Sequence, residues 1–174
     1  MKIIEKTPEV ITPTILELAE KLGATEVPRY VPVVPSPDSE VRRCYLNVDR
    51  VVAVQGGAPV EGWLIWEEAK HRWLMAIHHC VWRTPQDELV DVTRQEDGEA
   101  RIVLAPGGRR WDRVHPVANV YHPLVYDRTV RRFCEVQNDI GRWLERNTQA
   151  DVPYEPDYRL AKLANEMLKL ECKL

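Results

Sequence analysis

The chain has 174 residues, of which 44% are hydrophobic and 29% charged, with a formal net charge of -3 at pH 7. This length and balance predict one globular domain, residues 1–174, with a sizeable core. The basic residues form no tract, which argues against nucleic-acid binding, and no run of about 18 apolar residues would span a membrane. The N-terminal segment lacks the apolar core of a secretory signal, so we expect a cytoplasmic protein.

The first third of the chain predicts two helices separated by an extended connection. A threonine–proline pair and a closing glycine bound the first helix, residues 12–23. The proline density of residues 27–37 excludes a helix there and predicts an extended segment. Pro37 followed by Glu40 signals the start of a second helix, and apolar residues recur from there at helical spacing as far as a glycine pair at 56–57.

Beyond the glycine pair, the hydrophobic period becomes that of strands. Three segments rich in β-branched and aromatic residues, 62–67, 71–83 and 88–93, are separated by turn residues. They predict three antiparallel strands joined as a β-meander. Residues 101–106 predict a further strand, and residues 117–126 predict an extended segment.

Two amphipathic helices complete the chain. Asp127 is a typical helix cap before residues 128–146, and a proline-punctuated linker precedes a last helix over 157–172. Together these elements predict an α+β domain with N-terminal helices, a central antiparallel β-meander sheet, and C-terminal helices packing on it. Within this domain we expect a core unit over residues 36–106 and a helical part over 127–174.

Three residues in the middle of the chain predict a chemical site. Cys44 lies on the second predicted helix, His79 on the longest predicted strand and Asp91 on the next one. A hairpin turn centred on residues 85–86 places His79 opposite Asp91 or its neighbour. Because strand side chains alternate, His78 points to the other face, and we expect only one of the two histidines to face the core helix. A cysteine, a histidine base and an orienting carboxylate are the parts of a thiol hydrolase.

This order of residues resembles the papain-like superfamily of cysteine hydrolases and transferases, and its transglutaminase-like branch most closely. The similar motifs are His79-Cys80-Val81-Trp82 and Val90-Asp91-Val92-Thr93, within residues 44–93. The resemblance implies that Cys44 is the nucleophile, His79 the base and Asp91 the orienting residue. It also implies that the enzyme acts on an amide, isopeptide or thioester through an acyl-enzyme intermediate.

We assign Asn47, Trp63 and Trp82 as candidate substrate-binding residues, since tryptophan rings of the meander can line a groove for a peptide or acyl group. We expect no cofactor and no metal. The four cysteines form no CxxC pair, and His79 and Cys80 face opposite ways on a strand, which disfavours a zinc site. The expected partner is a peptide or protein substrate, and the sequence does not predict the oligomeric state.

Two interpretations compete with the enzyme hypothesis at this stage. Cys44 also fits an apolar stripe with Val41, Val48 and Val52, and would then be an ordinary core cysteine. The protein would in that case be a non-enzymatic interaction protein on the same fold. Its contact surface would be the aromatic sheet or the arginine-rich loop 109–113.

Overall fold

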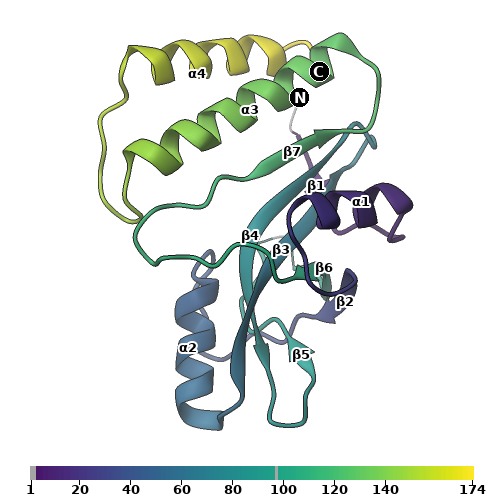
Figure 1. Ribbon diagram of the computed structural model, residues 1–174, viewed down its shortest axis with the longest axis vertical. Coiled ribbons are helices and arrows are strands. Elements are labelled where there is room, and N and C mark those ends of the chain that lie inside the picture. The colour runs from purple at the N-terminus through teal and green to yellow at the C-terminus, as the bar shows by residue number, and fades with distance from the viewer. Residues whose placement is uncertain (1–2, 97) are drawn as a thin grey trace. The chain divides into compact units, whose positions relative to one another are not determined.

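The computed structural model describes residues 3–96 and 98–174 (Figure 1). Among these residues it shows four helices: α1 (Pro13–Lys21), α2 (Cys44–Gln55), α3 (Arg128–Asn147) and α4 (Tyr158–Glu171). The strands are β1 (Glu5–Lys6), β2 (Arg29–Pro32), β3 (Ala58–Glu68), β4 (Trp73–Arg83), β5 (Leu89–Val90), β6 (Arg101–Pro106) and β7 (Val120–Pro123). The predicted fold class is confirmed, because helices precede and follow a central antiparallel sheet.

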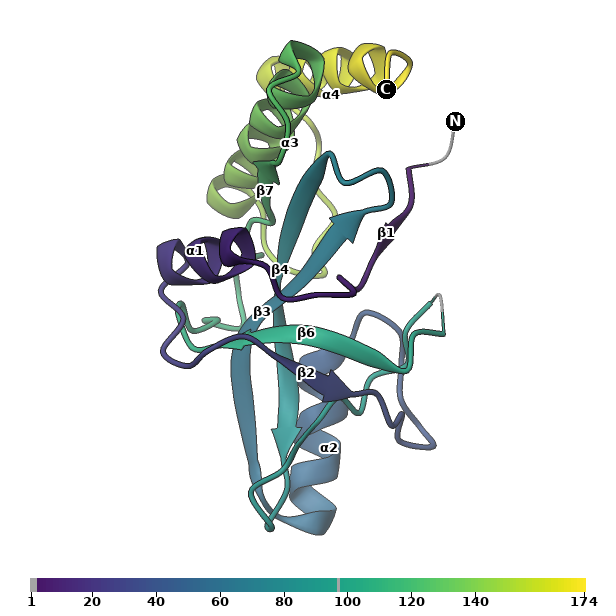
Figure 2. The same ribbon diagram turned by 90° about the vertical axis from the view of Figure 1, so that its right-hand side faces the viewer.

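The sheet is built on the two long strands β3 and β4. Its strands pair in the order β2-β6-β3-β4-β5, with β1 added on β3 and β7 on β4. The three predicted segments of the meander are confirmed as β3, β4 and β5. The predicted strand at residues 101–106 is confirmed as β6, and it lies between β2 and β3 rather than beyond β5. Figure 2 shows β2 and β6 running side by side.

The chain divides into two compact units. The α3–α4 unit comprises the described part of Met1–Lys6 together with Trp66–Ile77 and Trp111–Leu174. The α2 unit comprises Thr7–Ile65 and His78–Arg110. Each long strand therefore contributes one part to each unit. The C-terminal helices predicted for residues 127–174 belong to the first unit and Cys44, His79 and Asp91 all belong to the second.

In the α3–α4 unit, the amphipathic helix α3 packs its apolar stripe on β7 and α4. Trp73 and Phe133 form the centre of this core, with ring centroids 4.9 Å apart. Helix α3 begins at its predicted cap, Asp127, and α4 begins after an acidic cap that was not predicted, Asp157. The Asp127 carboxylate accepts a hydrogen bond from the Val130 N–H, and Asp157 does the same for Leu160.

In the α2 unit, helix α2 packs on the sheet through an apolar cluster. Val48 and Val51 of the helix contact Cys80 of β4 and Val92, and all four are buried. The far end of the helix is closed by Gly56, whose carbonyl accepts a hydrogen bond from the Trp82 indole N–H at 2.9 Å. This cluster holds the side of α2 that also carries Cys44.

The start predicted for the second helix, near Pro37, is wrong. Helix α2 begins only at Cys44, because two features of the preceding residues prevent an earlier start. The backbone of Glu40 bonds to the Asn47 side chain through both its N–H and its C=O, instead of entering a helix ladder. Arg42 then takes a left-handed conformation with φ of 62°. The result places Cys44 in the first turn rather than in the middle of the helix.

The predicted register between β4 and β5 is also wrong by a small amount. The observed pairs Trp82↔Val90 and Arg83↔Leu89 centre the turn on Gln86. Strand β5 is also shorter than predicted, because the chain leaves β4 after Val90. Asp91 instead forms a parallel bridge with Val33, and its N–H bonds to the Pro32 carbonyl.

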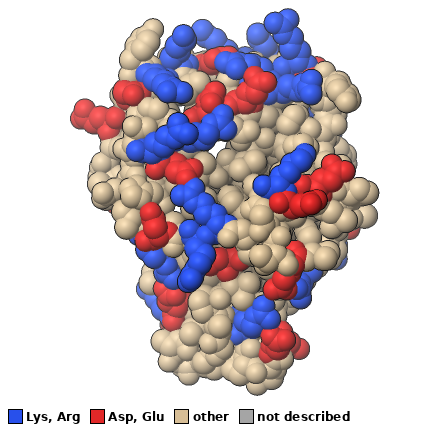
Figure 3. Space-filling view, viewed as in Figure 1, with Lys and Arg blue, Asp and Glu red and all other residues tan. Residues whose placement is uncertain are grey.

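Charges of both signs are interspersed over the face seen in Figure 3. Ion pairs on helix surfaces include Arg132 with Glu166 and Arg142 with Asp139. Of the helices in the described ranges, none is both long enough and apolar enough to cross a bilayer.

Gly57 offers a test of how tightly α2 is joined to the sheet. Its φ is 79°, and a Cβ at this position would collide with the Arg83 carbonyl oxygen and lie 2.7 Å from the Trp82 indole nitrogen. We expect Gly57→Ala to lower the free energy of unfolding by about 2–4 kcal/mol, from backbone strain plus overpacking. The matched control is Gly98→Ala, which has a similar φ of 74° but no atom within 4 Å of the new Cβ. Urea denaturation should give about 1 kcal/mol for the control, and equal losses for both variants would contradict this account.

Candidate active site

Cys44 occupies the first helical position of α2 and is partly exposed. The preceding residue, Arg43, makes no side-chain capping bond to the helix. The first N–H groups of an α-helix have no partner within the helix, and together they give its N-terminus a partial positive charge. Such a position favours the thiolate form of a cysteine.

His79 of β4 lies against the Cys44 thiol, and the two titrations are coupled. Burial alone would raise the pKa of the thiol. The charge of His79, a hydrogen bond to its ring and the N–H of Cys80 outweigh burial, so the pKa of Cys44 is lowered. This environment differs from that of Cys134, where burial raises the pKa of the thiol to about 12.

Asp91 holds the opposite side of the imidazole. The His79 Nε2 lies 3.0 Å from the Asp91 Oδ2, which leaves Nδ1 as the nitrogen available to Cys44. Both side chains are buried. Burial would lower the pKa of His79, but the carboxylate of Asp91 and the thiolate of Cys44 raise it well above its ordinary value. The environment thus favours a thiolate beside an imidazolium.

Asp91 has further hydrogen bonds that were not predicted from the sequence. Its Oδ1 accepts from the Thr93 N–H at 2.9 Å, and its Oδ2 accepts from the Gln95 side-chain amide at 2.7 Å. Thr93 belongs to the motif that marked Asp91, so its turn-forming bond was accessible to sequence reasoning. Gln95 lies four residues after Asp91, beyond the predicted strand, and no pattern indicated that it would reach the carboxylate.

The prediction that only one histidine reaches the helix is wrong. His79 contacts Cys44, and His78 contacts the next helical residue, with its Nδ1 2.6 Å from the Tyr45 hydroxyl oxygen. The two histidine side chains do leave β4 on opposite sides. Each still contacts the start of α2, because Cys44 lies next to His79 and Tyr45 lies next to His78. The His78 ring also stacks on Tyr45 and meets Trp63 edge-on at 5.2 Å between centroids.

His78 joins the helix start to the loop after β6. Its Nε2 lies 2.6 Å from the Arg109 carbonyl oxygen, which can only accept, so Nε2 carries the hydrogen. Burial lowers the pKa of His78, and the neutral ring then accepts the Tyr45 hydroxyl hydrogen at Nδ1. The same hydroxyl lies 3.2 Å from Glu61, and burial together with this carboxylate raises the pKa of Tyr45. These contacts fix the first turn of α2 against β3 and β4.

The three candidate substrate-binding residues lie in different environments. Asn47 is fully buried, and its amide bonds to Glu40 and Thr93, which indicates that it positions the loop before Cys44. Trp63 is only 4% exposed and packs on His78. Trp82 is partly exposed, and its indole N–H bonds to Gly56 at the far end of α2. The structure thus brings together Cys44, His79 and Asp91. Asn47 and Trp63 are buried in the packing beside them, and only Trp82 of the three candidates is partly exposed.

The arginine-rich loop 109–113 continues into a hydrogen-bonded turn. In the loop after β6, Asp112 accepts hydrogen bonds from His115 and Val114, and these bonds lower its pKa. This arrangement is a surface turn, and it is joined to the residues that follow α3 because the Val114 carbonyl accepts a hydrogen bond from the Ala150 N–H. Over the described stretches of the chain, no three His, Cys, Asp or Glu side chains are grouped so that they could hold a metal ion.

Comparisons with known proteins give no matching family model, curated protein or solved structure. Any assignment of function therefore depends on the geometry and chemistry of the site itself.

Asn47 provides a test of the support beneath the site. Replacing it with alanine removes a buried amide and leaves the Glu40 backbone groups without their partner. We expect Asn47→Ala to lower the free energy of unfolding by about 2–4 kcal/mol, measured by urea denaturation. The control is Asn147→Ala, an exposed residue that loses one bond to the Trp143 carbonyl and should cost about 1 kcal/mol or less. A loss at Asn47 no larger than the control would show that its amide does not support the loop.

Proposed function

We propose that the protein is a thiol-dependent hydrolase or acyl transferase that acts on an amide, isopeptide or thioester. Cys44 is the nucleophile, His79 the acid and base, and Asp91 the residue that orients His79. One observation carries the proposal: a cysteine at a helix start with a lowered pKa is paired with a histidine that is itself hydrogen-bonded to a buried carboxylate. This combination is costly to bury and has an immediate use in acyl transfer.

In the first half of the reaction, the Cys44 thiolate attacks the carbonyl carbon of the substrate. A carbon–sulfur bond forms as the bond to the leaving amine or thiol breaks. The leaving group takes the proton that His79 carries on Nδ1, and the acyl group remains on Cys44 as a thioester. Asp91 stabilises the imidazolium before this transfer and keeps its ring in the orientation that aims Nδ1 at the thiol.

In the second half, neutral His79 accepts a proton from the incoming nucleophile. Water then releases a carboxylic acid, whereas an amine releases a new amide. In both cases the carbon–sulfur bond breaks and Cys44 leaves as the thiolate, which restores the starting ion pair.

The developing negative charge on the carbonyl oxygen needs hydrogen-bond donors. The backbone N–H of Cys44 and those of the next residues lie in the first turn of α2, where the helix itself provides no acceptor. These groups are the donors that we assign to the oxyanion. Their role explains why the helix must begin at Cys44, since a nucleophile in mid-helix would have its N–H engaged.

A purely interaction-based function has less support. Its proposed contact surface included the sheet tryptophans, but Trp63 and Trp73 are buried and serve as core. A core function for Cys44 alone would also leave the buried pair His79 and Asp91 without a purpose. We place the reaction in a reducing compartment such as the cytoplasm, because Cys44 must remain a free thiol.

The pH dependence of alkylation tests the nucleophile. In a Cys172→Ser background, which removes the exposed cysteine, iodoacetamide should label Cys44 with a midpoint below the value of about 8.5 for a free thiol. The thiolate fraction falls only when pH drops through the lowered pKa, so labelling persists at neutral pH. In His79→Ala, the charge and the hydrogen bond of the ring are lost while burial remains, so the midpoint should rise to about 8.5 or above.

The matched control is His71→Ala, which removes an exposed histidine of the β3–β4 hairpin and should leave the midpoint unchanged. Mass spectrometry of the peptides confirms that Cys44 carries the label. A midpoint near or above 8.5 that does not respond to His79→Ala would overturn the enzyme proposal.

Acylation by a simple thioester tests the reaction itself. Phenyl thioacetate should release about one equivalent of thiophenol per chain in an initial burst, with the acetyl group on Cys44, as in other acyl-enzymes. Cys44→Ser should abolish the burst. Adding an amine such as glycine amide distinguishes the two activities: a transferase yields acetylated amine, and a hydrolase yields acetate alone. Absence of an acetyl adduct on a correctly folded, reduced chain would contradict the proposal.

A further inference from the structure

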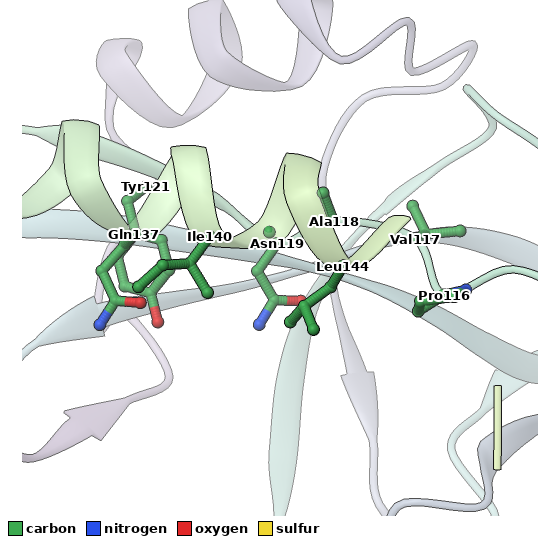
Figure 4. A pocket seen from close by; sticks show the side chains of 9 residues that line it. Pro116, Val117, Ala118, Asn119, Tyr121, Gln137, Ile140 and Leu144 are labelled. Atoms are coloured by element: carbon green, nitrogen blue, oxygen red, sulfur yellow. The ribbon is translucent and has the colours of Figure 1, made fainter. Parts of the chain in front are cut away.

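A second candidate site lies wholly within the α3–α4 unit, to which none of the residues of the proposed reaction belongs. A groove of about 160 Å³ runs between α3 and the extended segment 116–119 that precedes β7 (Figure 4). Gly141 lets the two approach, since a Cβ there would lie only 3.2 Å from the Ala118 Cβ. None of the side chains that line the groove is charged.

Two carboxamides are available in this groove. Figure 4 shows the ends of Asn119 and Gln137 on the same side of α3, with Ile140 and Leu144 beside them. Within the portion of the chain that the structure covers, neither amide group makes a side-chain hydrogen bond. Each therefore offers a donor and an acceptor to a bound molecule.

Asn138, which follows Gln137 on α3, shows how a carboxamide on this helix binds an extended backbone. The Asn138 Oδ1 accepts from the Tyr121 N–H at 2.7 Å, and its Nδ2 donates to the Tyr121 carbonyl at 2.9 Å. A single side chain thus pairs with both polar groups of one residue, as a neighbouring strand would. Gln137 precedes Asn138 on the helix and carries the same group without such a partner.

The walls of the groove define the rest of the ligand. A charged ligand would be desolvated without a counter-charge, which is costly. The aliphatic side chains of Ile140 and Leu144 favour an apolar group next to the amides. The volume is close to that of a cavity of about 150 Å³ that holds one benzene ring, so it accommodates a single aliphatic residue.

We propose that this groove binds one aliphatic residue of an extended, uncharged peptide segment. Asn119 and Gln137 bond to its peptide groups, and its side chain packs on Ile140 and Leu144. The site is independent of the chemistry at Cys44, so a Cys44→Ser chain binds the peptide equally well. If the proposed reaction fails and this site holds, the protein is a peptide-binding module. If both hold, the site is a second contact for a peptide substrate or partner.

The test uses N-acetyl-leucine methylamide, a neutral molecule with one leucine side chain between two peptide groups. Titrated into the ¹⁵N-labelled chain of 174 residues, it should shift the side-chain NH₂ signals of Asn119 and Gln137 saturably, with a dissociation constant on the order of millimolar for so few atoms. N-acetyl-leucine, which has the same side chain but a carboxylate, should bind at least about tenfold more weakly because its charge has no partner.

Variants locate the binding. Gln137→Leu keeps the bulk of the side chain and removes its amide, and should weaken binding about tenfold, the effect of one lost hydrogen bond. Asn119→Ser is the second variant, used if the first changes the spectrum of the whole unit. Gln149→Leu, an exposed glutamine outside the groove, is the control and should bind like the parent. Shifts that stay linear up to the solubility limit, equal binding of the carboxylate, or unchanged binding by both groove variants would overturn the proposal.

Discussion

The buried carboxylate of Asp91 is the interaction on which the arrangement of the α2 unit depends. Its side chain is fully buried, and a carboxylate removed from water without partners would cost several kcal/mol. Three donors prevent this cost: the His79 ring, the Thr93 N–H and the Gln95 amide. To collect them, the chain must leave β4 after two paired residues and run beside Val33. The same departure brings the Thr93 hydroxyl to the Asn47 amide, so the carboxylate also determines how the loop before Cys44 is held.

The pairing of His79 with Asp91 could be predicted even though the register was not. The predicted turn placed His79 opposite Asp91 or its neighbour. In the observed register, continuing the ladder places His79 opposite Thr93. Asp91 is then two positions from the residue opposite His79, and because side chains of a strand alternate with a period of two, His79 and Asp91 share a face as diagonal neighbours. A diagonal pair is still within reach of an imidazole and a carboxylate. The presence of helix α3 could also be predicted from the sequence, because a cap such as Asp127 bonds to a residue only three positions away.

The features that sequence patterns did not predict are those that depend on distant partners. Nothing local in residues 36–43 indicates that the Glu40 backbone bonds to Asn47, yet this contact delays the helix until Cys44. Likewise, strand alternation correctly places His78 and His79 on opposite faces of β4. It does not reveal that the Tyr45 side chain lies next to His78. The division into two units also follows from contacts between segments far apart in the chain. In each case a tertiary contact overrides a pattern that is read over about ten residues.

Cys44 can be both a core cysteine and a reactive thiol in the folded chain. Packing in the core requires apolar neighbours, whereas reactivity requires a charged or hydrogen-bonding group beside the sulfur. Cys44 packs with the Val48 cluster, as a core cysteine would. Cys134 also packs in an apolar cluster, in the α3–α4 unit. There burial without a charged partner raises the pKa of the Cys134 thiol to about 12. The apolar packing is thus common to both, and the difference arises entirely from what lies at the other side of the sulfur. At Cys44 that side holds His79, the N–H of Cys80 and the start of a helix. Since burial strengthens each of these interactions by excluding water, the apolar stripe increases the effect of the histidine on the thiol.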